Sequence, residues 1–126
     1  MKKTIIISGI ACNFKSSAAL PRMYRLKFRI DLFVDLNNLK KQVEVNQRMQ
    51  EEMESSESDL PIDSLEIFEN IAFLMHKHGD PNQPKDIDEW LEQFETFDIY
   101  EVLPEILSLW NMDNEQMSEP KKENGK

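Results

Sequence analysis

The sequence contains one cysteine, two histidines and three glycines. A single cysteine excludes an internal disulfide, so Cys12 is expected to be a packing residue in a reducing compartment. His76 and His78 point in different directions on a helix, which disfavours a metal site with Asp80. Together with Lys77 they fall in a last helical turn, where positive charge is stabilised. The glycines form neither a phosphate-binding loop nor a nucleophile elbow. We therefore expect no metal, no cofactor and no catalysis.

Long hydrophobic runs are also missing. The longest, at residues 4–7 and 71–75, are far shorter than the roughly 20 apolar residues that a membrane span needs. Lys2 and Lys3 before an apolar stretch resemble the start of a signal peptide, but Gly9 interrupts it. The sequence thus predicts a cytoplasmic protein without a membrane segment, with enough apolar residues for one modest core.

Charge is distributed unevenly along the chain. Residues 1–49 carry ten Lys or Arg against three acids, residues 50–126 carry five against twenty-one, and the net charge is −9. Two halves of opposite sign can steer encounters with charged partners or with a second copy of the chain, and they can equally be solvated faces. A homo-oligomer is therefore one expectation.

The N-terminal residues predict a β-hairpin. β-Branched and apolar residues flank Gly9 throughout residues 4–14, which is typical of two strands joined by a tight turn. The pattern that follows is helical, so the expected fold is mainly α, in the α+β class, with about five helices after the hairpin. One domain is expected to cover residues 1–111, and the polar residues 112–126 are expected to be a disordered tail.

Two helices are expected in the basic half. Ser16 or Ser17 is expected to cap the first, which ends near Phe28. The second opens near Asp31, with Phe33 beside its apolar stripe. That stripe recurs at steps of four, three and four residues and consists of Leu32, Leu36, Leu39 and Val43.

Three helices are expected in the acidic half, after a flexible acidic connector at residues 50–60. Each begins with a capping box, in which an aspartate is followed three residues later by a glutamate. The aspartates are Asp63, Asp86 and Asp98. Gly79 is expected to end the first of these helices, and Pro104 predicts a kink or break in the last.

Residues 15–29 concentrate positive charge with interleaved aromatics, a pattern also found on nucleic-acid-binding faces. The acidic remainder of the chain would repel a phosphate backbone. Arginine's planar fork also suits carboxylates, so three arginines are expected to pair with acids of this chain or of a partner. They are Arg22, Arg25 and Arg29.

Aromatic and methionine side chains supply candidates for partner contact, although both residue types are equally common in cores. The candidates on the basic side are Tyr24, Arg25 and Phe28, and those on the acidic side are Trp90, Tyr100 and Trp110. Four methionines lie outside any apolar stripe and are further candidates: Met49, Met53, Met112 and Met117.

A Phe-Lys pair followed by small residues, a Tyr-Arg pair, a phenylalanine and an aspartate occur in this order within residues 14–41. They are Phe14, Lys15, Tyr24, Arg25, Phe28 and Asp31. This order resembles the tail assembly chaperone family of long-tailed phages and of Gram-positive prophages, except that Arg29 and Ile30 replace a glycine and an arginine. Residues 68–111 are similar to the family's helix, loop and Asp-Glu-Trp-Leu continuation.

The resemblance implies a protein that binds the phage tape measure protein and keeps it soluble while tail tube subunits gather. It also implies absence from the mature virion. In that family a ribosomal frameshift often produces a longer form that recruits the tail tube protein, and Lys121 and Lys122 are compatible with a slippery codon run. Two alternatives stay open: a small regulatory protein that binds nucleic acid through residues 15–29, and a structural tail or neck component.

Overall fold

The computed structural model describes residues 1–53 and 60–110. Its elements are β1 (Lys2–Ile7), β2 (Ile10–Lys15), α1 (Leu20–Phe28), α2 (Leu32–Met53), α3 (Ile62–Gly79), α4 (Ile87–Glu92) and α5 (Ile99–Leu109). The predicted fold, an N-terminal hairpin followed by five helices, is confirmed. Predictions about residues 54–59 and 111–126 lie outside the described part of the chain. So do those about the side chains of Met49, Met53 and Tyr100.

The hairpin is closed by a two-residue turn with positive φ at both positions, 55° at Ser8 and 81° at Gly9. Such a turn matches the right-handed twist of the paired strands. The Ser8 hydroxyl accepts a hydrogen bond of 3.1 Å from the backbone N–H of Glu95, which attaches the turn to the loop between α4 and α5. The inward side chains of the strands join the core, namely Ile5, Ile7, Cys12 and Phe14.

The first helix begins without a side-chain cap, because its N-cap residue is Ala19. The predicted serine cap is therefore wrong. Ser17 instead accepts a local hydrogen bond from the Ala19 N–H and forms a 2.8 Å hydrogen bond with Nε2 of His78, at the end of α3. At its other end, α1 stops where Arg29 adopts a left-handed backbone with φ of 65°. The chain then turns sharply into α2.

The second helix opens as predicted, with the Asp31 carboxylate accepting a 2.8 Å hydrogen bond from the Phe33 N–H. Its predicted stripe is confirmed, since Leu32, Leu36 and Leu39 are buried and Val43 packs against the core. The helix continues to Met53, so the prediction of a connector from residue 50 is wrong for residues 50–53. Those residues include neither glycine nor proline, and Gln, Glu and Met favour helix.

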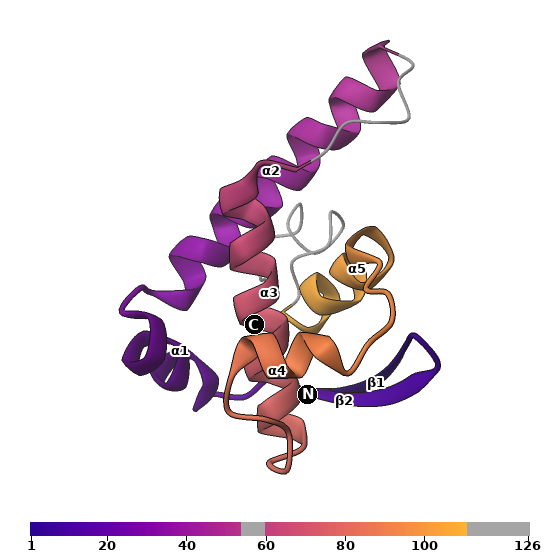
Figure 1. Cartoon of the computed structure of the whole chain (residues 1–126). Helices are drawn as coiled ribbons and strands as arrows, with labels where there is room; N and C mark the ends of the chain where they lie inside the picture. The colour runs from indigo at the N-terminus through magenta and orange to yellow at the C-terminus, as the bar shows by residue number, and fades with distance from the viewer. Residues whose placement is uncertain (54–59, 111–126) are drawn as a thin grey trace, which may run out of the picture.

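The third helix runs through the middle of the molecule, with α1 and the tip of the hairpin on opposite sides of it (Figure 1). The far end of α2 extends beyond the other elements (Figure 1). The α3 N-cap is Pro61, so the predicted cap by Asp63 is wrong. The helix begins two residues earlier than expected, which places Asp63 in the first turn, where its negative charge interacts favourably with the helix dipole.

The predicted caps of α4 and α5 are confirmed. The Asp86 carboxylate accepts from the Glu89 N–H and the Asp98 carboxylate from the Glu101 N–H, each at 3.3 Å. Helix α5 continues through Pro104 without a break, with buried apolar side chains before and after the proline. Within residues 1–53 and 60–110, no helix has the length and apolar character needed to cross a bilayer.

Candidate protein-binding surface

The structure places Trp90, a predicted contact residue, in the core. Its side chain is fully buried, and its indole N–H donates a 2.8 Å hydrogen bond to Nδ1 of His76. Three aromatic rings, one from α3 and two from the loop between α4 and α5, surround it at centroid distances of 5.4 to 5.6 Å, namely Phe73, Phe94 and Phe97. Trp90 therefore fixes α4 onto α3.

Tyr24 is also buried, and its hydroxyl donates a 2.7 Å hydrogen bond to the carboxylate of buried Asp35. Burial, followed by the neighbouring Asp35 carboxylate, raises the pKa of Tyr24 well above its ordinary value. Phe28 is partly buried, with its ring centroid 4.7 Å from that of Tyr24. These two aromatic side chains hold α1 against α2 and leave Arg25 as the exposed member of the predicted basic-side set.

Trp110 lies half-buried just after α5. Its indole N–H donates to the Met75 sulfur at 3.3 Å, and its ring meets Phe33 edge-on at a centroid distance of 5.9 Å. Trp110 thus connects the end of the described chain to the start of α2.

The titratable side chains in the interior are engaged in packing. Burial raises the pKa of the Cys12 thiol to about 11, so the thiol stays protonated and is a poor nucleophile. Burial lowers the pKa of His76, with partial compensation from the Asp80 carboxylate. Because His76 is neutral and accepts from Trp90, the expectation that it carries positive charge at the helix end is wrong. Lys77 supplies that charge and donates to the carbonyl oxygens of Pro81 and Gln83.

Among the described residues, no three His, Cys, Asp or Glu side chains lie close enough together to hold a metal ion. An open cleft between the hairpin and the end of α3 is lined by Lys2, Lys3, Thr4, Asn13 and Gly79. One of its two ammonium groups, that of Lys3, is paired with Glu105. The Thr4 hydroxyl donates a 2.8 Å hydrogen bond to Asn13, so these two lining side chains are paired with each other.

Four large apolar side chains are exposed where α1 turns into α2. They are between 46% and 54% exposed and comprise Leu26, Ile30, Phe33 and Val34. Leu26 is in the last turn of α1, Ile30 is in the connecting turn, and Phe33 and Val34 are in the first turn of α2. We call these four residues, together with Arg22, Arg25 and Arg29, the corner surface.

Arg29 follows α1 as its C-cap residue, with a left-handed backbone. The other two arginines of the corner surface, Arg22 and Arg25, lie three residues apart on one face of α1, with Leu26 beside them. Their face is opposite the buried one, which carries Leu20 and Tyr24. The corner surface thus places cationic and apolar groups side by side.

None of these arginines forms an ion pair with a carboxylate in the described parts of the chain. The two acids nearest in sequence are already engaged, because Asp31 caps α2 and Asp35 is buried against Tyr24. Pairing within the chain, one of the two expected roles of the arginines, is therefore not found among residues 1–53 and 60–110.

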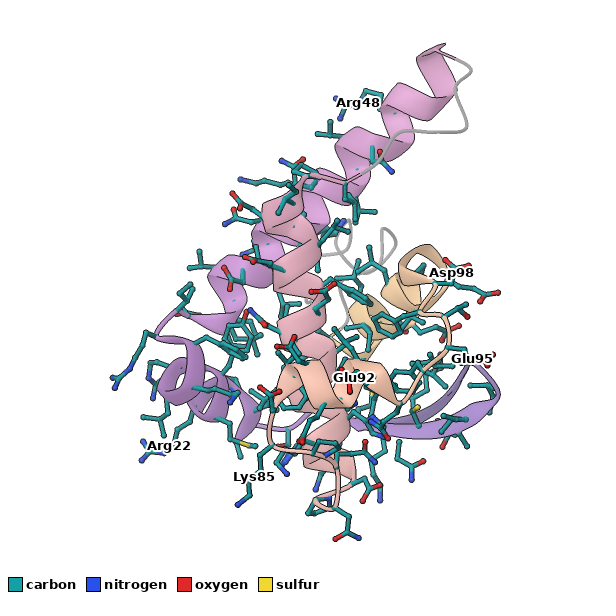
Figure 2. The ribbon with its side chains drawn as sticks, in the orientation of Figure 1. Arg22, Arg48, Lys85, Glu92, Glu95 and Asp98 are labelled. Carbon is teal, nitrogen blue, oxygen red and sulfur yellow. The ribbon has the colours of Figure 1, made fainter. Side chains whose placement is uncertain are left out.

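The fold also separates the charges in space. Arg22 lies on α1 at one side of the molecule, Glu95 and Asp98 lie at the other side, on the loop that follows α4, and Glu92 lies between them on α4 (Figure 2). Arg48 lies far along α2 (Figure 2). Arg22 is therefore remote from Glu95 and Asp98 (Figure 2). Lys3 of the hairpin, in contrast, forms an ion pair with Glu105.

The apolar part of the corner surface was missed by the sequence predictions, which favoured the aromatic residues. One signal was available, because Val34 is opposite the stripe of Leu32, Leu36 and Leu39 on a helix of 3.6 residues per turn. An apolar side chain opposite a buried stripe is a candidate for partner contact. Leu26 and Ile30 gave no comparable signal, because their exposure depends on how α1 packs against α2.

Comparison of the chain with protein-family models, with curated proteins and with solved structures finds no match.

Proposed function

We propose that the protein is a non-enzymatic tail assembly chaperone of a tailed phage or prophage. In the host cytoplasm it would bind the tape measure protein and keep it soluble while tail tube subunits assemble. A longer frameshifted form would recruit the tube protein. The observation that carries the proposal is the corner surface, since exposed apolar side chains rimmed by charge are a common feature of protein-binding sites. The resemblance over residues 14–41 and 68–111 supplies the identity of the partner.

The interior chemistry supports a binding role rather than catalysis. Cys12 is buried with a raised pKa, and His76 is held by Trp90. Tyr24 is held by Asp35. A catalytic acid, base or nucleophile needs access to a substrate, and these buried side chains lack that access.

The direct test is co-expression with the phage's very long helical tape measure protein, whose gene is expected next to this one. Expressed alone, the tape measure protein should be insoluble, because its apolar helices are exposed. Co-expressed, it should be recovered from the soluble fraction together with this chain. A tape measure protein that stays insoluble, or that is soluble without binding this chain, contradicts the proposal.

Particle composition separates the chaperone from a structural tail or neck component. Mass spectrometry of purified virions should detect tube and tape measure proteins but not this chain. Stoichiometric recovery of the chain from particles would favour the structural alternative.

A nucleic-acid-binding regulator is the second candidate, and it is favoured by the arginine face of α1. Its signature would be micromolar binding to duplex DNA that falls steeply, by orders of magnitude, between roughly 50 and 200 mM salt. The chaperone proposal expects no such binding.

A further inference from the structure

We infer that the corner surface is the binding site for an amphipathic helix of a partner protein. In that helix, carboxylates flank the apolar stripe. The inference rests on the proposed function, because it names the surface and the segment chemistry through which the chaperone holds its partner.

The apolar half of the corner surface requires a partner with an apolar stripe. Leu26, Ile30, Phe33 and Val34 each leave about half of their surface exposed, and they follow one another around a single bend of the chain. Covering such side chains contributes roughly 25 cal/mol for each Å² of apolar area removed from water. A partner that presents only charged groups would cover none of this apolar area and would gain none of this free energy.

A helix is the partner segment that this surface suits. The surface is built from α1, α2 and their connecting turn, and it contains no strand. An extended peptide would therefore find no strand edge there with which to pair its backbone. A helix satisfies its own backbone hydrogen bonds and presents apolar side chains at steps of three and four residues.

The cationic half of the corner surface requires acidic groups on that helix. The guanidinium groups of Arg22, Arg25 and Arg29 are exposed and have no ion pair within the described residues. Arginine binds carboxylates through two parallel hydrogen bonds when geometry permits. Carboxylates placed one turn apart beside the apolar stripe would match the spacing of Arg22 and Arg25 on α1.

A second copy of the chain matches the charge but lacks the apolar stripe. The acidic side carries Glu92, Glu95 and Asp98, but Ile62 alone is a large exposed hydrophobic among the described side chains of residues 60–110, and one side chain does not form a stripe. Nucleic acid likewise offers anions but no aliphatic surface for Leu26 or Val34. A separate acidic amphipathic helix supplies both the apolar stripe and the carboxylates that the two halves of the corner surface require.

The test uses labelled helical peptides of about 20 residues, long enough to hold a helix in water when rich in alanine. One peptide carries a leucine stripe flanked by glutamates. In a second the glutamates are replaced by lysines, and in a third the leucines are replaced by serines. The full-length chain should bind the first, and each replacement should weaken binding at least about tenfold.

Matched charge-reversal variants test whether the corner surface is the binding site. The variant Arg22→Glu/Arg25→Glu/Arg29→Glu should lose at least about tenfold in affinity for the glutamate peptide. The control Lys41→Glu/Arg48→Glu/Lys85→Glu has the same net charge and changes exposed residues outside the corner surface, so it should bind nearly as well as the unmodified chain. Leu26→Ser/Val34→Ser should weaken binding without changing charge. Circular dichroism and urea unfolding confirm that each variant is folded.

Three outcomes overturn the inference. One is equal loss in the corner and control variants, which would mean unspecific attraction. Another is displacement of the peptide by an equal concentration of duplex DNA, and the third is self-association that the corner variant abolishes while peptide binding is unchanged.

If the tape measure protein co-purifies equally with the unmodified chain and with the corner variant, the proposed function stands and the corner surface is not the binding site. If it binds neither, the proposed function fails, and the inference fails with it.

Discussion

The indole N–H of Trp90 donates a 2.8 Å hydrogen bond to Nδ1 of His76, and both side chains are buried. Because Nδ1 accepts, the neutral ring carries its proton on Nε2. This bond joins α4 to the last turn of α3 and lies within the cluster of aromatic rings around Trp90.

Replacement of Trp90 by phenylalanine should therefore destabilise the protein. The substitution removes the donor, leaves Nδ1 of a buried imidazole without its partner and creates a small void, for a cost of about 1 to 3 kcal/mol. Urea unfolding followed by circular dichroism measures the loss. The exposed neighbour Glu92, changed to glutamine, is the control and should stay within about 0.5 kcal/mol of the unmodified chain. A Trp90→Phe protein as stable as the control would show that the bond contributes nothing.

Stability should fall as the pH drops below about 6.5, the ordinary pKa of histidine. Burial lowers the pKa of His76, and burial together with the charges of Lys15 and the N-terminus lowers that of His78. The unfolded chain thus takes up protons first on acidification. This contribution of the two histidines to stability is fully present above their pKa in the unfolded chain. It is lost as the pH falls toward their lower pKa in the folded protein.

The pH prediction is checked by comparing urea midpoints at about pH 7.5 and about pH 5.5, a window that spans the unfolded pKa. Glu69, whose pKa burial raises, works in the opposite direction, so a matched variant is needed. His76→Gln should flatten the dependence, and His78→Gln should leave the His76 part of it in place. An unchanged slope in His76→Gln would contradict the assignment.

The hydrogen bond between Tyr24 and Asp35 should couple α1 to α2 energetically. Tyr24→Phe leaves a buried carboxylate without this donor and should cost about 1 to 3 kcal/mol. A double-mutant cycle with Asp35→Ala isolates the interaction, and its coupling energy should fall between about 0.5 and 3 kcal/mol. Additive effects of the two substitutions would mean that the pair does not hold the corner together.

Gly79→Ala should be more harmful than Gly9→Ala. A Cβ at position 79 would lie 2.3 Å from the backbone oxygen of Asn13, so β2 would have to move away from α3. This overpacking should outweigh the roughly 1 kcal/mol gained from alanine's helix propensity and leave a net cost of about 1 to 3 kcal/mol. At Gly9 nothing lies within 4 Å, and only the positive φ of 81° opposes a side chain. Thermal unfolding of both variants gives the order, and the reverse order would refute the close approach of β2 to α3.

Several parts of the fold could be predicted because they depend on neighbours in sequence. The caps at Asp86 and Asp98 require only a carboxylate three residues before a free N–H, and the α2 stripe requires only helical spacing. Errors arose where a local signal competed with a distant contact. Ser17, for example, meets His78 across 61 residues instead of capping α1.

The sequence by itself determined the order of hairpin and helices, the opposite charges of the two halves and the positions of the main apolar stripes, since each follows from composition and spacing. Only the tertiary structure decided that Trp90 and Tyr24 are buried while Leu26 and Val34 stay exposed. It also decided that the α1 arginines find no carboxylate within the described chain. The physical reason is that spacing defines the faces of one helix, whereas burial depends on which other element covers each face.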